Sequence, residues 1–116
     1  MSPRSSGMST LEYHVLLSMA AGPLYGYAIK DAIEHESDGS VSPRAGSLYR
    51  VLGRMMASGL VTEEDPPADE APHPGLTRKY YGLTPMGREA LADQSQRLKQ
   101  AALLAEKRLG LAKSNR

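Results

Sequence analysis

Residues 42–58 read SPRAGSLYRVLGRMMAS. The Ser-Pro pair that opens this stretch is typical of a helix start, because a hydroxyl can cap free backbone N–H groups and proline fits the first turn. Leu48, Leu52 and Met55 then recur at helical spacing and form one apolar face. We therefore predict a helix from the Ser-Pro pair to about the end of this stretch, with Gly59 as its C-terminal cap.

The charges within this helix are all of one sign. Between Ser40 and Gly59 the only charged residues are Arg44, Arg50 and Arg54, whereas residues 30–38 are acidic on balance. For any one arginine alone, an ordinary solvated helix face is the simpler interpretation. Three arginines without an acid, beside an uncrowded helix start rich in Gly and Ser, favour contact with a phosphate backbone.

Two helices are predicted before this segment. Residues 9–12, Ser-Thr-Leu-Glu, have the pattern of a capping box, and apolar residues at helical spacing follow until Gly22-Pro23 ends the helix. The second helix is expected from about residue 26 to residue 37, with Ile29 and Ile33 on one face.

A β-hairpin is predicted next. Residues 60–65 and 77–83 have the alternating Val, Thr and Tyr composition of strands. Residues 66–75 contain four prolines, which predicts an extended and mobile tip instead of a tight turn. Because side chains alternate along a strand, we expect one of Tyr80 and Tyr81 to lie in the core and the other to be half exposed.

A long helix is predicted at the end of the chain. Thr84-Pro85 repeats the start pattern, and about 25 residues of helix span roughly 37 Å, too much for so small a core to cover. Leu91, Leu98 and Ala105 are seven apart and indicate a short coiled-coil seam, which Ser95 interrupts. One interpretation is that this face packs only on the chain's own first helix, and the other is that it contributes to a dimer. The two are compatible if the first helix itself lies in the dimer interface. The predicted dimer contacts are Leu11, Leu91, Leu98, Ala102, Ala105 and Leu109.

This order of elements predicts a mainly α protein with a small β-hairpin, a winged helix-turn-helix domain with a long C-terminal dimerisation helix. The expected organisation is a flexible tail over residues 1–8, the DNA-binding domain over 9–84, the dimerisation helix over 85–110 and a flexible tail over 111–116. In this fold the third helix enters the major groove of DNA.

The start of the third helix is the candidate reader of base edges. Arg44 can contact guanine or clamp a phosphate, and Ser47 can donate to either. Tyr49 and Arg50 are better suited to phosphate contacts, which position the helix without reading sequence.

The hairpin is the candidate for a second DNA contact. Arg78 and Lys79 on its return strand can reach phosphates or the minor groove, whereas Asp69 and Glu70 make its tip acidic. The acidic tip and a net charge of only +1 favour the alternative, a winged-helix protein-interaction module that does not bind DNA.

Three blocks carry a resemblance to a known family. They are GPLYGY at 22–27, GSLYR at 46–50 with GLV at 59–61, and RKYYGLTPMGR at 78–88. In this order they resemble the signature blocks of the PadR family of transcriptional regulators, over roughly residues 11–91. The resemblance implies a winged-helix domain that binds double-stranded, pseudo-palindromic operator DNA as a homodimer, and usually repression that a small-molecule effector relieves.

The resemblance also assigns residues to the DNA side, namely Tyr27, Ser47, Tyr49 and Arg50. One departure is that family members often place Ser-Pro directly before the GSLYR-like block, whereas Arg44-Ala45 lies between them here. The full predicted DNA-binding set is Tyr27, Ser42, Arg44, Ser47, Tyr49, Arg50, Arg54, Arg78 and Lys79.

Other chemistry is not indicated by the 116 residues. The chain has no Cys, its three His are not spaced as metal ligands, and neither a phosphate-binding glycine loop nor a catalytic triad is apparent. We therefore expect no cofactor, no metal and no enzymatic activity. Without a signal peptide or an apolar span, we also expect a cytoplasmic protein that does not contact a membrane.

Overall fold

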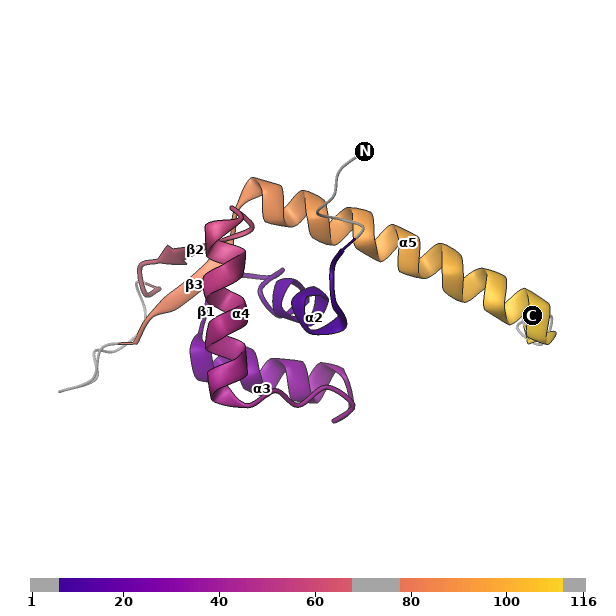
Figure 1. The fold of residues 1–116 in the computed structure, drawn as a ribbon, viewed down its shortest axis with the longest axis horizontal. Helices are drawn as coiled ribbons and strands as arrows, with labels where there is room; N and C mark the ends of the chain where they lie inside the picture. Colours follow the sequence, from indigo (N-terminus) through magenta and orange to yellow (C-terminus); the bar gives the residue numbers. More distant parts are fainter. Residues whose placement is uncertain (1–6, 68–77, 112–116) are drawn as a thin grey trace.

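The computed structural model describes residues 7–67 and 78–111. Most of the predicted hairpin tip and most of both predicted tails lie outside these residues. The helices are α2 (Thr10–Ser18), α3 (Gly26–Glu36), α4 (Ala45–Ala57) and α5 (Pro85–Leu109), and the strands are β1 (Leu24–Tyr25), β2 (Val61–Glu64) and β3 (Tyr80–Leu83). The predicted architecture is confirmed: α2, α3 and α4 form a helical head beside a small wing, and α5 extends away from it (Figure 1).

The start of α2 agrees with the predicted capping box. The Ser9 hydroxyl accepts from the backbone N–H of Glu12 at 3.1 Å, and the Glu12 carboxylate accepts from the backbone N–H of Ser9 at 2.8 Å. The helix ends at Ser18, before the predicted stop at Gly22-Pro23. The Ser18 hydroxyl donates to the carbonyl of Val15 at 2.7 Å, and this local bond competes with continuation of the helix.

The predicted start of α4 at the Ser-Pro pair is wrong. The helix begins at Ala45, and Arg44 occupies the N-cap position without a side-chain capping bond. The Ser42 hydroxyl instead donates to Oε2 of Glu34 on α3, at 2.7 Å. Because its hydroxyl is engaged with Glu34 and the helix begins three residues later, Ser42 belongs to the connection between α3 and α4.

The sheet contains one strand that was not predicted. All pairs are antiparallel in the order β1-β3-β2, and Tyr25 of β1 lies opposite Tyr80. The two rings meet edge to face with centroids 5.6 Å apart. The expectation that one of Tyr80 and Tyr81 is half exposed is therefore wrong, since both are only 4% exposed. Tyr81 joins the main core, whereas Tyr25 packs against Tyr80.

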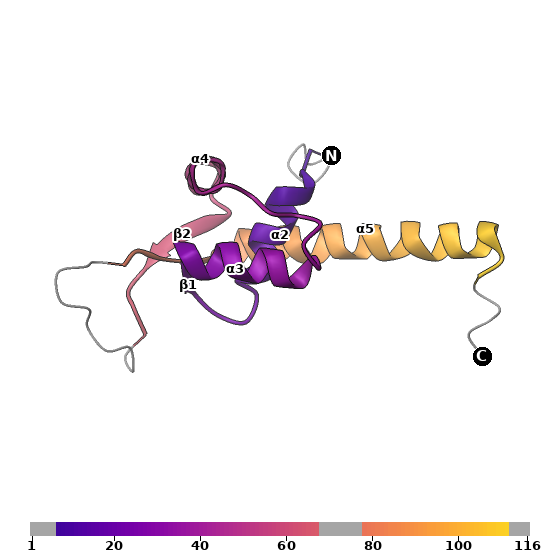
Figure 2. The same cartoon turned by 90° about the horizontal axis from the view of Figure 1, so that it is seen from below.

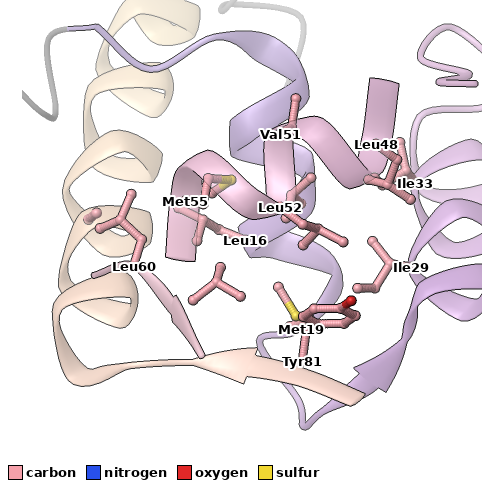
Figure 3. Close-up of a cluster of buried hydrophobic side chains, with 13 residues drawn as sticks. Leu16, Met19, Ile29, Ile33, Leu48, Val51, Leu52, Met55, Leu60 and Tyr81 are labelled. Atoms are coloured by element: carbon pink, nitrogen blue, oxygen red, sulfur yellow. The ribbon is translucent and has the colours of Figure 1, made fainter. Parts of the chain in front are cut away.

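The core lies between the three helices of the head and the sheet (Figure 3). The predicted stripe of Leu48, Leu52 and Met55 is confirmed, and all three side chains are buried. They share the core with side chains from the rest of the head and from the sheet region, among them Leu16, Met19, Ile29, Ile33, Leu60 and Tyr81. Because one face of α4 is held by this core, its opposite face points away from the molecule.

The start of α5 is anchored to the segment that joins α4 to β2. The Thr84 hydroxyl accepts from the backbone N–H of Gly87 at 2.9 Å and donates to the carbonyl of Gly59 at 2.5 Å. A Cβ on Gly87 would overlap the carbonyl oxygen of Leu60, so a glycine allows α5 to approach this closely. From this contact, which we call the Thr84 anchor, α5 runs straight past the head (Figure 2).

The C-terminal part of α5 also agrees with the prediction. The helix ends at Leu109, and Gly110 follows in the left-handed conformation with φ +77°. Within residues 7–67 and 78–111, no helix combines the length and the apolar character of a membrane span.

Candidate nucleic-acid interface

The exposed side of α4 carries arginines without acidic neighbours. Arg44 at the N-cap and Arg50 near the middle of the helix are both exposed. Neither forms an ion pair with another residue in the described part of the chain. Their charges therefore remain available to an external anion.

The first turn of α4 is open enough for close approach. A Cβ placed on Gly46 would meet no atom within 4 Å. Ser47 is half-buried, and the Tyr49 side chain is 49% exposed. The predicted contact residues on this turn thus surround a backbone that a DNA groove could approach without displacing other side chains.

A small cleft separates the start of α3 from the start of α4. It has a volume of about 90 Å³ and is lined by Gly26, Tyr27, Lys30, Ala45, Leu48 and Tyr49. A Cβ on Gly26 would overlap the Tyr49 hydroxyl, which shows how closely this ring lies against α3. Tyr27 is 69% exposed. The structure therefore brings together Tyr27 and Tyr49, which are 22 positions apart in the sequence.

Sequence reasoning missed Lys30, which lines the same cleft. Its ammonium group donates to Oε2 of Glu34 at 2.9 Å, and this bond raises the pKa of Lys30. Lys30 lies in a segment that is acidic on balance, so the charge pattern of the sequence did not indicate it as a candidate for DNA contact. A helical plot would have found it, because Lys30 is one turn from Tyr27.

Glu34 connects α3 to the segment before α4. Its Oε2 accepts from both Lys30 and Ser42, and these two bonds lower the pKa of the carboxyl group. Ser42 is exposed, but its hydroxyl is already engaged in this contact. The structure thus places Ser42 as a support for the α3–α4 connection.

Arg54 lies at the other end of α4. Its Nη2 is 3.5 Å from Oε2 of Glu12, the residue that also closes the capping box of α2. Arg54 is ten residues from Arg44, or about 15 Å along the helix. The three arginines therefore do not form one cluster, and the charge of Arg54 is partly offset.

The two cations of the wing, Arg78 and Lys79, each lie beside a partner side chain. The Arg78 guanidinium lies 4.2 Å from the centroid of the Tyr25 ring, a cation–π arrangement, and Nζ of Lys79 is 3.8 Å from Oε2 of Glu63. On β2, both Glu63 and Glu64 are exposed. Both cations precede β3, which begins at Tyr80, so the prediction that they lie on the return strand is wrong, and their partners leave the wing much less positive than the sequence suggests.

The predicted dimer contacts divide into two groups. Leu11 and Leu91 are half-buried and pack against the chain's own core. The other four are exposed, namely Leu98, Ala102, Ala105 and Leu109. Leu103 and Leu104 are exposed as well, and the seam pattern missed them because they lie on other faces of the helix.

The three-helix head, the β2–β3 wing and the projecting α5 define a winged helix-turn-helix protein. The chain matches the model of the transcriptional regulator PadR-like family over residues 15–93 and belongs to that family. This match confirms the resemblance to the PadR family of transcriptional regulators that the sequence blocks indicated.

Solved structures of this family are similar over most of the chain. A PadR-like transcriptional regulator from Bacillus cereus is 27% identical with a TM-score of 0.70, covering 93% of this chain and 97% of its own. Bacillus subtilis PadR in complex with operator DNA is 26% identical with a TM-score of 0.60, covering 73% of this chain and 46% of its own.

One curated protein is more similar in sequence. An uncharacterized 37.1 kDa protein in transposon TN4556 of Streptomyces fradiae is 46% identical over 77 residues. The match covers 66% of this chain but only 19% of that protein, so the present chain corresponds to about a fifth of its length.

Proposed function

We propose that this chain binds double-stranded operator DNA as a homodimer and represses transcription. One observation carries the proposal: Arg44 and Arg50 are exposed on α4 without an acidic partner among the described residues, while the opposite face of the helix is held in the core. The similarity to Bacillus subtilis PadR, whose structure contains operator DNA, supports DNA binding, and in a winged helix-turn-helix protein the third helix is the element expected to enter the major groove.

The proposed DNA contacts are of two kinds, those that read base edges and those that position α4 on the duplex. Arg44 and Ser47 at the start of α4 are proposed to reach base edges, where a guanidinium can bind guanine with two hydrogen bonds. Tyr27, Tyr49 and Arg50 are proposed to contact phosphates. Such contacts orient the helix and contribute affinity that does not depend on sequence.

A homodimer fits the exposed apolar side chains of α5. Leu98 is 44% exposed and Leu109 is 71% exposed, so the second half of the predicted seam has no cover from the head. Pairing of two such helices would bury them and present two copies of α4 to one duplex. Binding at half-sites one helical turn, or roughly 34 Å, apart would multiply the affinity of a single head. Repression and its release by a small-molecule effector are the parts of the proposal that rest on the family resemblance alone.

Selection of bound duplexes from a random oligonucleotide pool tests the proposal directly. The expected result is enrichment of inverted half-sites with one preferred spacing. Affinity for the selected duplex should fall steeply with salt, because each phosphate contact releases counterions. Arg44→Ala should change the preferred bases, whereas Arg50→Ala should weaken binding to all sequences alike. Absence of any enrichment at low salt would contradict DNA binding.

The protein-interaction module is the second candidate, and the exposed Glu63 and Glu64 on β2 favour it. It predicts that the random pool yields no enriched sequence. It also predicts that partner binding persists in high salt and after loss of Arg44 and Arg50. The same selection therefore separates the two functions.

A further inference from the structure

Ser95 is the polar position in the otherwise apolar seam of α5. Its Oγ lies 2.7 Å from the Tyr13 hydroxyl oxygen on α2, and both residues are half-buried. Immediately beyond it, residues 96–105 are all exposed. Ser95 is therefore at the place where α5 leaves the head.

We propose that the Tyr13–Ser95 hydrogen bond sets the direction of α5 and thereby the separation of the two DNA-reading helices in the dimer. The Thr84 anchor holds the start of α5, at the junction of α4 and β2. Ala90 and Leu91 then pack against the core, and a rod held only along its first two turns can still tilt. Contact at a second point, eight residues or about 12 Å after Gly87, fixes its direction.

A small tilt at this contact would matter for DNA. From Ser95 to the end of α5 at Leu109 there are 14 more residues, or about 21 Å of helix. A tilt of about 10° would displace the far end by about 4 Å, close to the roughly 3.4 Å rise of one base pair. Because the two helices pair along this segment, the displacement would change the distance between the two copies of α4.

A hydrogen bond suits this role better than an apolar contact. Apolar side chains tolerate sliding, whereas a polar group within a helical seam specifies one register at a cost in stability. The neighbouring Nδ1 of His14 and Oε1 of Gln94 are also buried and have no hydrogen-bond partner within residues 7–67 and 78–111. The contact between α2 and α5 therefore contains several polar groups at this point. A shift of α5 would add the hydroxyl groups of Tyr13 and Ser95 to the groups that lack a hydrogen-bond partner.

The inference rests on the proposed dimeric DNA-binding function, so its test includes a readout that needs no DNA. The chain has no Cys, so Met56→Cys on the exposed side of α4 creates a single site for a spin label. Electron-electron resonance on the labelled full chain measures the distance between the two spin labels of a dimer. We expect one narrow distribution of this distance. Adding Tyr13→Phe or Ser95→Ala should abolish the single narrow peak, and the double variant should be no broader than either single variant.

Gln96→Ala is the matched control, since Gln96 is the exposed neighbour on α5 and should leave the distribution narrow. In unlabelled chains, selection from duplexes that differ only in half-site spacing provides the second readout. Discrimination between the best spacing and one two base pairs longer should fall about tenfold in Tyr13→Phe and Ser95→Ala, about the worth of one hydrogen bond.

The outcomes separate the two levels of the argument. The proposed dimeric DNA-binding function would be overturned if the labelled chain with Tyr13 and Ser95 intact gave no measurable distance between two labels. It would also be overturned if the wild-type chain selected no DNA. A wild-type dimer with a narrow distribution that both variants retain, with only a lower melting temperature, would overturn the role of Tyr13 and Ser95 alone.

Discussion

The exposed side of α4 and the wing both carry basic residues, but the structure gives them different surroundings. On α4, Arg44 and Arg50 have no acidic partner in the described part of the chain. On the wing, Arg78 lies over the Tyr25 ring and Lys79 lies beside Glu63. A cation that already has a partner contributes less to binding an external phosphate, because part of its charge is offset before the phosphate arrives. The comparison predicts that α4 dominates DNA affinity.

The largest expected effect is therefore on α4. The double variant Arg44→Ala/Arg50→Ala should lose about 2 kcal/mol per arginine, or about a thousandfold in Kd together. Fluorescence anisotropy with the selected duplex over a series of salt concentrations measures both the loss and the smaller salt slope. The control Arg97→Ala/Lys99→Ala removes the same charge from exposed positions on α5. Equal losses in the two double variants would show that only net charge matters.

Arg54 tests whether an acidic neighbour weakens a cation on α4 itself. Arg54→Ala should raise Kd only about threefold, because Glu12 already offsets the charge at 3.5 Å. Glu12→Gln should act in the opposite direction by about twofold, since glutamine keeps the capping box while releasing Arg54. The same anisotropy titration checks both variants. A loss with Arg54→Ala as large as that with Arg50→Ala would contradict the argument.

The wing should respond with the smallest change in affinity. Lys79→Ala is expected to raise Kd less than threefold, whereas Glu63→Gln should lower it about twofold by freeing Lys79. Both differences should disappear at about 1 M salt, where exposed charges are screened within roughly 3 Å. Unchanged binding at low salt in both Lys79→Ala and Glu63→Gln would place the wing away from phosphate altogether.

Acidification tests the support of α4 through Glu34. Because bonds from Lys30 and Ser42 lower the pKa of Glu34, its contribution to stability is present above the ordinary glutamate pKa and is lost as pH falls through the lowered value. The melting temperature of Glu34→Gln should be slightly below that of the wild type at pH 7, and the gap should close below about pH 4. A gap that stays constant from pH 7 to pH 3 would assign the effect to packing instead of charge.

Local patterns predicted the elements whose causes lie within a few residues. The capping box at Ser9, the Thr84 cap and the stripe through Leu48 are all found where the sequence indicates. By contrast, β1 has only two residues, too few for alternation to be visible, and it is a strand because β3 pairs with it. The burial of Tyr80 follows from that pairing and could not be read from β3 alone.

The chain's own residues determine the class of protein: the helical stripes, the caps and the three sequence blocks indicate a winged helix-turn-helix protein, because each depends on spacing along one segment. Tertiary structure alone decides which polar groups are already engaged. Ser42 contacts Glu34 across the connection, Arg54 contacts Glu12 on another helix, and Tyr13 meets Ser95 from 82 positions away. The physical reason is that a charge or hydroxyl acts on whatever lies within a few ångströms, and sequence order does not specify those neighbours.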